Sequence, residues 1–290
     1  MKKIKFAVIG SGRLGTNLAI QLQKAGHIAV GLCAKHVKSI ECTNRLLNVR
    51  LVDTIPWKVT PQADVVFITT PDDLIERTCK QVSANQGFKQ HCTVFHCSGS
   101  LSSQILTDNI SDDHDAGSLH PLQSFPVKHI EPNPFENIYM SVEGSEKAIE
   151  LGKAFAKDLK ANVAEISSSG KQLYHTAAVV ASNYLVTLLW MAQQLNMTAG
   201  IPESIALKVL NPLIEGTLAN IQKQGIPSAL TGPISRGDIQ TVHNHIEKII
   251  NELPEVLDLY KMLGRYTVPL AQKQCNISEK MAKSFQEKLS

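Results

Sequence analysis

Three glycines near the start of the chain have the spacing of a turn that binds a dinucleotide. Gly10, Gly12 and Gly15 match the pattern GxGxxG, follow an apolar run that predicts a strand, and open an amphipathic helical segment. The first glycine permits a tight turn, the second lets a pyrophosphate approach the backbone, and the third allows close helix–strand packing. The predicted cofactor-binding turn comprises Gly10, Ser11, Gly12, Arg13, Leu14 and Gly15. The alternative is a turn that serves the fold alone.

The residues after the second predicted strand bear on which dinucleotide would bind. An NAD site usually has Asp or Glu there, about 20 residues beyond the glycines, to bind the ribose 2′-hydroxyl. This chain instead has Ala34, Lys35 and His36, followed by Lys38, and its first acid is Glu41. Because cations suit a 2′-phosphate, we predict NADP(H) in preference to NAD(H), with Lys35 as a binding residue. The alternative is that these lysines simply begin a solvated helix.

Two further predicted strands end in short runs of small and hydroxyl-bearing residues. Because dinucleotides bind outside the carboxyl ends of parallel strands, both runs should lie at the site and leave room for ribose and nicotinamide. The residues are Thr69, Thr70, Pro71, Cys97, Ser98 and Gly99. Cys97 could be a reactive thiol, but we interpret it as a small residue that lines the pocket.

Polar side chains on an otherwise apolar helix, predicted over 170–197, are candidates for proton transfer. At about 100° per residue, Lys171, His175 and Ser182 fall within about 40° of one face, with Asn183 at its edge. Burying such groups costs free energy unless they are paired or functional. Hydride transfer to a C=O or C=N carbon needs a proton donor, and the pKa of histidine suits His175 to that role. Lys171 could be the acid or bind a substrate carboxylate, while Ser182 or Asn183 could orient the substrate or the cofactor carboxamide.

A second histidine competes with His175. His120 precedes Pro121 in a predicted turn near the expected pocket, with Gln123 as a hydrogen-bonding neighbour. Both histidines also have a structural interpretation, His175 at a seam between domains and His120 within its turn.

A predicted loop over 231–238 carries Arg236, whose planar guanidinium could clamp a substrate carboxylate or phosphate. Arg236 could instead pair with Asp238 or lie at a subunit interface, and we favour a structural role for Asp238. His243 and His245 have no third ligand at a suitable spacing, so we predict no metal site.

The elements that must position these residues change in kind halfway along the chain. The first half alternates strands and helices, which predicts a parallel sheet covered by helices. Its expected strands are 5–9, 28–33, 65–69, 93–96, 138–142 and 161–166, with a helix at 13–25. The later expected helices are 170–197, 202–224, 234–253, 254–261 and 268–288. We predict an α/β Rossmann domain with a mostly parallel, doubly wound sheet over 1–166 and an all-α domain over 167–290.

Composition narrows the class of protein. Twenty-nine Lys and Arg against 26 Asp and Glu give a net charge of +3 without a basic block. This charge gives no electrostatic reason to expect binding to nucleic acid or to a membrane surface. Six cysteines without a CxxC pair indicate reduced thiols and a cytoplasmic protein.

The N-terminal apolar run breaks at Gly10, which favours a first strand over a signal peptide. The longest apolar stretch, 177–192, is shorter than the ~20 residues of a membrane span, so a buried helix is expected. Its own domain or a second subunit should cover it.

Three segments, taken with the glycine turn, resemble a known family. They are GSLHPLQSF at 117–125, KQLYH at 171–175 with ASNY at 181–184, and TGPISRGD at 231–238. Over nearly the whole chain they resemble predicted oxidoreductases that join a Rossmann-like domain to a helical domain of unknown function, number 2520. That family is similar in architecture to pyrroline-5-carboxylate reductase, ketopantoate reductase and the β-hydroxyacid dehydrogenases. The resemblance implies a homodimer formed through the helical domain, with a substrate cleft between the domains.

The resemblance does not supply a catalytic pair. Ketopantoate reductases and β-hydroxyacid dehydrogenases place a Lys and an Asn about one helical turn apart, whereas Lys171 and Asn183 are twelve residues apart. We therefore predict an NADP(H)-dependent oxidoreductase that transfers a hydride to or from a small carbonyl or imine, with its substrate undetermined. The alternative is a non-catalytic NAD(P)-binding redox sensor or interaction protein.

Overall fold

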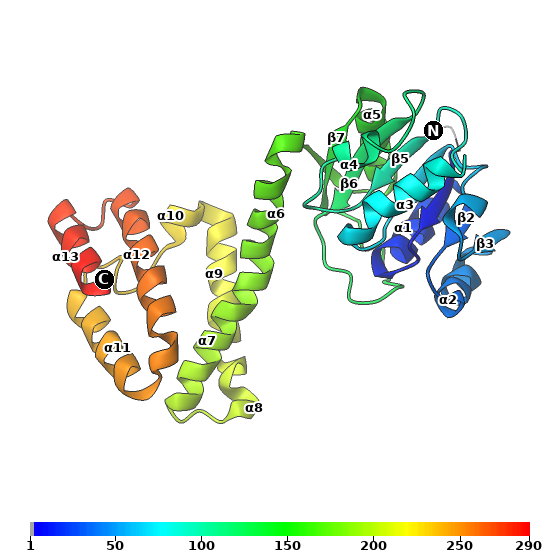
Figure 1. Cartoon of the computed structure of the whole chain (residues 1–290). Coiled ribbons are helices and arrows are strands. Elements are labelled where there is room, and N and C mark those ends of the chain that lie inside the picture. The colour runs from blue at the N-terminus through cyan, green and yellow to red at the C-terminus, as the bar shows by residue number, and fades with distance from the viewer. Residues whose placement is uncertain (1–2) are drawn as a thin grey trace. The chain divides into compact units, whose positions relative to one another are not determined.

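The computed structural model describes residues 3–290 and divides the chain into two compact units, Met1–Val180 and Ala181–Ser290 (Figure 1). The first unit is built on one eight-stranded sheet with the order β3-β2-β1-β4-β5-β6-β7-β8. All neighbouring strands are parallel except β6 and β7, which are antiparallel. The strands are β1 (Lys5–Ile9), β2 (Ile28–Cys33), β3 (Leu51–Asp53), β4 (Val65–Ile68), β5 (Thr93–His96), β6 (Asp115–Pro121), β7 (Tyr139–Gly144) and β8 (Asn162–Glu165). The predicted Rossmann architecture is confirmed.

Two of these strands were not predicted from the sequence. β3 is only three residues long, too short for an alternating pattern to be recognised. β6 has the sequence DAGSLHP, which lacks the β-branched and aromatic residues that usually indicate a strand. It is nevertheless mostly buried between β5 and β7, so tertiary packing decides its conformation.

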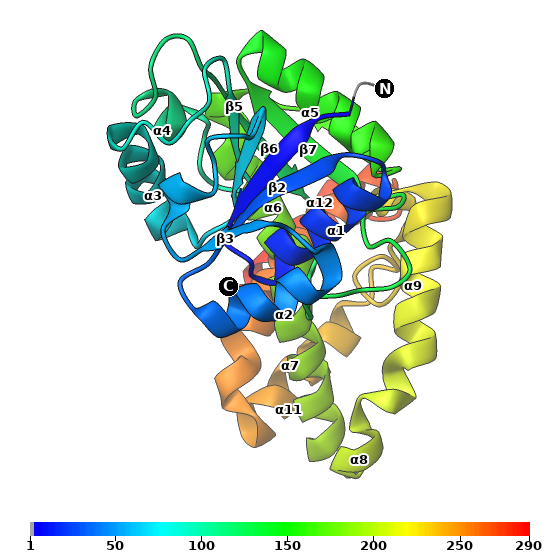
Figure 2. The ribbon, with the colours of Figure 1, turned by 90° about the vertical axis from the view of Figure 1, so that its right-hand side faces the viewer.

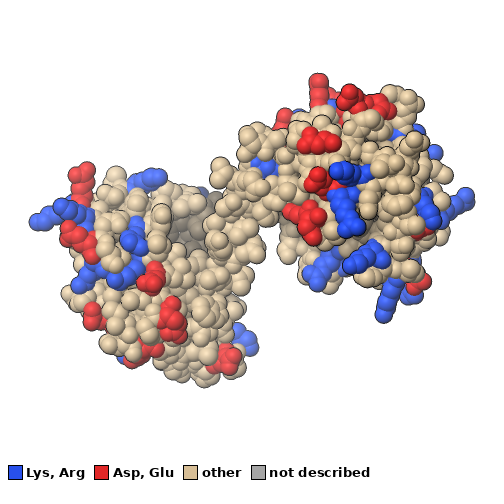
Figure 3. Space-filling model, viewed as in Figure 1, with Lys and Arg blue, Asp and Glu red and all other residues tan. Residues whose placement is uncertain are grey.

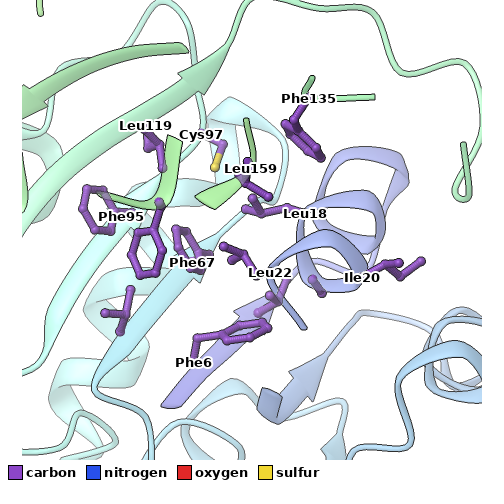
Figure 4. Packing of buried hydrophobic residues seen from close by; sticks show 14 of the residues in the cluster. Phe6, Leu18, Ile20, Leu22, Phe67, Phe95, Cys97, Leu119, Phe135 and Leu159 are labelled. Atoms are coloured by element: carbon purple, nitrogen blue, oxygen red, sulfur yellow. The ribbon is translucent and has the colours of Figure 1, made fainter. Parts of the chain in front are cut away.

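Helices cover both faces of the sheet and bury a separate apolar core on each. One core joins β-strand residues such as Phe6, Phe67 and Phe95 to helices on the same face, and Figure 4 shows these rings beside Leu18 and Leu22. The helices on that face are α1 (Arg13–Lys24), α2 (Val37–Leu47) and α5 (Glu146–Asp158). The other face is packed by α3 (Asp72–Ala84) and α4 (Gln104–Thr107). This burial on both faces explains the continuous apolar runs of the central strands.

The remaining described elements are helical, as predicted. Besides short 3₁₀ turns, they are α6 (Lys171–Val179), a π-helical turn over Val180–Tyr184, α7 (Leu185–Thr198), α8 (Glu203–Ala206), α9 (Asn211–Gln224), α10 (Ile226–Ala229), α11 (Ile239–Glu252), α12 (Leu257–Lys273) and α13 (Glu279–Leu289). The predicted break at 262–267 is wrong, because α12 continues through it. Val268 and Ala271 anchor that part of α12 in an apolar core shared with α11 and α13. The chain leaves the helix later, near Cys275, which has a φ of 59°.

The first compact unit extends beyond the predicted domain end at residue 166. It continues to Val180 and therefore includes α6. The reason is a set of side-chain contacts from α6 to the sheet, of which the pairing of Lys171 with Glu143 on β7 is the most buried. The start of the helical region thus belongs structurally to the sheet.

Candidate functional site

The glycine turn has the steric features expected of a dinucleotide cradle. Gly10 has a φ of +110°, and a Cβ built on it would lie 2.7 Å from the backbone of Thr69, so only glycine fits. A Cβ on Gly15 would overlap the carbonyl of Gly10, which explains why α1 packs so closely on the sheet. A Cβ on Gly12, by contrast, would meet no atom within 4 Å. The fold therefore requires Gly10 and Gly15, whereas Gly12 keeps open the space where a pyrophosphate would approach.

A pocket of about 300 Å³ lies next to this turn, at the carboxyl ends of β1, β2 and β4. Its lining includes Gly10, Ala34, Lys35 and Thr70, together with Arg77 on α3. The Thr70 hydroxyl oxygen is buried and has no hydrogen-bond partner among the described residues. A pocket with this position, a free hydroxyl and two cations fits the adenosine half of a dinucleotide.

Two histidines flank Gly99 at the carboxyl end of β5. A Cβ on Gly99 would lie 2.8 Å from Nδ1 of His175 and 2.9 Å from Nε2 of His120. The two imidazole centroids are 6.4 Å apart, and Nδ1 of His120 lies 3.4 Å from the Tyr174 hydroxyl. Nδ1 of His175 is buried and has no hydrogen-bond partner within residues 3–290. The fold thus brings both predicted proton donors together at the carboxyl ends of the strands.

His120 is not in a turn, contrary to the sequence prediction. It lies on β6 and is paired with Ser141 on β7. An extended strand places its side chain opposite α6, and this allows the contact with Tyr174. The turn signal of Pro121 misled the prediction, because Pro121 ends the strand instead.

Beneath the histidines lies a buried ion pair. Lys171 is 1% exposed, and its Nζ lies 3.5 Å from Oε1 of Glu143 and donates a hydrogen bond to Ser118. The Glu143 carboxylate also accepts hydrogen bonds from the Ser103 backbone N–H at 2.7 Å, the Ser103 hydroxyl at 2.8 Å and the Ser168 hydroxyl at 2.7 Å. Lys171 is therefore a buried charged residue that pairs within the protein. This position differs from the substrate-facing one predicted from the sequence.

These charges set the protonation of the nearby histidines. Burial and then the positive charge of Lys171 lower the pKa of His120 to about 4. The same two causes lower the pKa of His96, on β5, to about 4. Burial also lowers the pKa of Lys171, although Glu143 opposes this effect. Burial disfavours the charged form of Glu143, but hydrogen bonds from Ser168 and Ser103 and the charge of Lys171 outweigh it, so its pKa is lowered. His120 is consequently a neutral imidazole at neutral pH.

The loop after β5 has little freedom to use its own side chains on a ligand. The Ser98 hydroxyl donates to Asp72 at 2.7 Å and accepts from the backbone N–H of Leu101 at 3.1 Å. Cys97 packs into the apolar core, and burial raises the pKa of its thiol to about 12, which argues against a reactive thiolate. These contacts fix the position of Gly99 between the histidines.

The other predicted site residues lie elsewhere. Ser182 and Asn183 are exposed in the π-helical turn, whose wider winding breaks the 100° register on which their placement depended. Both belong to the second unit, as does Arg236, which is exposed. Gln123 is exposed and accepts a hydrogen bond from the Ser124 backbone N–H. Their roles toward a substrate stay predictions.

The loop over 231–238 has a clear structural role at its end. Asp238 is the N-cap of α11, accepting hydrogen bonds from the Thr241 backbone N–H at 3.0 Å and its hydroxyl at 2.6 Å. Across residues 3–290, no cluster of three metal-ligating side chains was found.

Sequence reasoning missed Glu143 and Ser118, which hold Lys171. Glu143 lies in the run SVEG of β7, where a glutamate is usually taken to face solvent. The only indication in the sequence was a glutamate within an otherwise apolar strand. To recognise it as buried, one must know that the strand is covered on both faces.

Family comparisons agree with this architecture. Residues 1–121 match the model of a Rossmann-like domain, and residues 138–267 match the model described as a domain of unknown function, DUF2520. The chain therefore contains a Rossmann-like domain followed by a DUF2520 domain, which confirms the resemblance drawn from the sequence. No curated protein matches the chain in sequence.

Several solved structures share the fold. A candidate NADP oxidoreductase from Bacteroides fragilis is 24% identical with a TM-score of 0.74, covering 92% of this chain and 98% of the other. Protein TM1727 from Thermotoga maritima is 24% identical with a TM-score of 0.70, covering 96% and 98%. Pyrroline carboxylate reductase from Plasmodium falciparum, solved with NADP bound, is 14% identical with a TM-score of 0.60, covering 100% of both chains. At these identities the likeness establishes the fold.

Proposed function

We propose that this chain, with its Rossmann-like and DUF2520 domains, is an NADP(H)-dependent oxidoreductase acting on a small carbonyl or imine. One observation carries the proposal: the glycine turn after β1 and the histidine pair beside Gly99 lie at the same edge of one sheet. β1 and β5 are separated only by β4, and both end at that edge. A dinucleotide bound across these strand ends would extend from the adenosine pocket toward the histidines.

The protein would position the substrate and handle the proton, while the bound nicotinamide supplies or accepts the hydride. His120, neutral because of burial and Lys171, can accept a proton from an alcohol or amine during oxidation. In the reverse direction the imidazolium form of His120 can return that proton to the substrate heteroatom. His175, across Gly99, is placed to share this role. Lys171 acts on His120 through its charge, since it is itself buried.

The preference for NADP(H) rests on charge around the adenosine pocket. Lys35 and Arg77 line it, and the residues that end β2 carry no acid that would bind a ribose 2′-hydroxyl. Two cations without a carboxylate favour a 2′-phosphate.

A pair of glycine variants tests cofactor binding. Gly12→Ala should lower NADPH affinity at least about tenfold, because the added methyl occupies the approach of the pyrophosphate. It should leave thermal stability nearly unchanged, since Gly12 has a φ of −77° and open space around its Cβ position. Fluorescence titration with NADPH and NADH, alongside thermal melting, measures both effects.

Gly216→Ala is the matched control, because a Cβ there also meets nothing within 4 Å. It should leave NADPH affinity unchanged, while the melting temperature should rise slightly, because alanine inside α9 is more favourable than glycine by up to about 1 kcal/mol. If wild-type protein binds neither nucleotide, the glycine turn serves the fold alone and the oxidoreductase proposal fails.

We also propose that the chain forms a homodimer through its helical region. Apolar side chains on α7 and α9 are strongly exposed, including Val186 at 67%, Trp190 at 50% and Leu213 at 68%. In Figure 3 the surface around α6 and α7 carries almost no charged side chains. One helical stretch, Ser168–Thr198, is long and apolar enough to cross a membrane by length and composition alone. The beginning of this stretch is held in the first unit by the buried pairing of Lys171. We therefore favour a second copy of the chain, and not a membrane, as the cover for the exposed apolar side chains.

Sedimentation at micromolar concentration should give about twice the 31.7 kDa mass of one chain. The double variant Val186→Glu/Leu213→Glu should shift the protein to monomer, because two carboxylates would be buried in the interface. A monomeric wild-type protein, or one that sediments only with lipid vesicles, would overturn the dimer.

A further inference from the structure

The connection between β6 and β7 is far longer than is needed to join two neighbouring antiparallel strands. The two strands are antiparallel neighbours, which a turn of two to five residues can join. This connection instead runs over 122–138 without helix or strand. It passes alongside α1 in both ribbon views (Figures 1 and 2). Loops of this length in compact domains are usually functional or disordered, and this one is firmly attached.

A buried asparagine on α1 attaches it. Asn17 is fully buried, and its side-chain amide donates to the carbonyl of Val127 at 2.9 Å and accepts from the N–H of Ile130 at 3.0 Å. The two bonds lie on either side of Lys128 and His129. The asparagine thus fixes the backbone from which the Lys128 side chain extends.

Lys128 is held against the cofactor-binding turn. Its Nζ donates a hydrogen bond to the Ser39 hydroxyl at 2.6 Å, and that hydroxyl donates to the carbonyl of Ser11 at 3.1 Å. Ser11 belongs to the glycine turn, and Ser39 lies in the first turn of α2, directly after the strand that ends beside Lys35. The ammonium therefore stands between the two segments that would hold the phosphates of a dinucleotide.

This placement is electrostatically unfavourable for the protein by itself. Helix N-termini carry partial positive charge, so a cation near the starts of α1 and α2 is repelled. Within residues 3–290, Lys128 has no carboxylate within 4.0 Å to compensate, whereas Lys24 at the other end of α1 is paired with Glu131. An ammonium that is held in place beside two helix N-termini and has no carboxylate partner is suited to bind an anion there.

We infer that Lys128 is a binding residue for the 2′-phosphate of the cofactor, delivered by the 122–138 connection. The inference rests on the proposed function and adds a specificity residue from a part of the chain remote from the usual nucleotide-binding segments. The N–H groups that begin α2 complete the anion site. Ser39, whose hydroxyl and N–H already bond to the carbonyls of Ser11 and His36, positions the ammonium. The choice of the 2′-phosphate over the pyrophosphate follows from the direct contact with Ser39 on α2, the helix that follows β2.

Lys128→Met tests the inference by separating the two nucleotides. We expect NADPH affinity to fall about 10- to 100-fold, since a charge-assisted hydrogen bond to phosphate is lost. NADH affinity should stay within about twofold, because NADH carries no 2′-phosphate. The melting temperature without nucleotide should be unchanged or slightly higher, since an unfavourable charge is removed.

Two further variants serve as controls. Lys24→Met removes one cation and one contact to the same connection at its Glu131, yet should leave NADPH affinity unchanged. Lys128→Arg keeps the charge and should retain most of the selectivity. Unchanged NADPH affinity in Lys128→Met, or an equal loss for NADPH and NADH, would overturn the assignment to the 2′-phosphate. If the wild-type protein binds neither nucleotide, the proposed function fails first, and that result is seen without any variant.

Discussion

Lys171→Met should destabilise the sheet-containing unit by about 3–5 kcal/mol, the typical cost of removing one partner of a buried ion pair. The variant leaves the Glu143 carboxylate, whose side chain is 2% exposed, with only neutral donors around it. For a unit of this size the loss corresponds to roughly 6–20 °C in melting temperature. Calorimetry would resolve this transition from that of the helical unit.

The double variant Lys171→Met/Glu143→Gln provides the control. Neutralising both partners removes the unpaired charge, so it should recover a substantial part of the lost stability. Equal destabilisation in the single and double variants would mean that packing of the lysine chain, and not its charge, holds α6 on the sheet.

The largest expected effect on activity comes from the histidine pair. His120→Ala and His175→Ala should each lower turnover about 10²- to 10⁴-fold, the usual contribution of a positioned acid or base. NADPH affinity should change little, because the adenosine pocket and glycine turn are untouched. Steady-state assays with small carbonyl and cyclic imine substrates, paired with NADPH titration, measure both quantities. A variant with full turnover would remove that histidine from the mechanism.

The protonation of His120 can be measured without any substrate. NMR titration should give a pKa of about 4, and Lys171→Met should raise it because the second-largest cause of the lowering is removed. Since the folded-state pKa lies below the unfolded value of about 6.5, His120 contributes its stability fully above pH 6.5. That contribution is lost as the pH falls toward 4. Activity that needs neutral His120 should follow the folded-state pKa alone, so it should be constant above about pH 5 and lower below pH 4.

Local patterns were sufficient to predict much of the molecule. β1, β2 and β5 have the predicted bounds, because short apolar runs bounded by turn residues specify buried strands without reference to the rest of the chain. The glycine turn is similarly local, since its steric demands arise within a few residues and the neighbouring strand. The same holds for the cap of α11, where Asp238 bonds a residue three positions away.

The tertiary structure decided the contacts between residues that are far apart in sequence. Lys171 meets Ser118 across 53 positions, and Lys128 meets Ser39 across 89, so neither pairing leaves a periodic signal. His120 adopts a strand only because β5 and β7 lie on either side of it. The sequence by itself determined that a GxGxxG turn opens the first helix and that histidines and a lysine are available for the proposed proton transfer. Only the packing of α6 and the 122–138 connection decided which of those groups are buried, charged and adjacent, because burial and Coulomb interactions depend on distance in space and not along the chain.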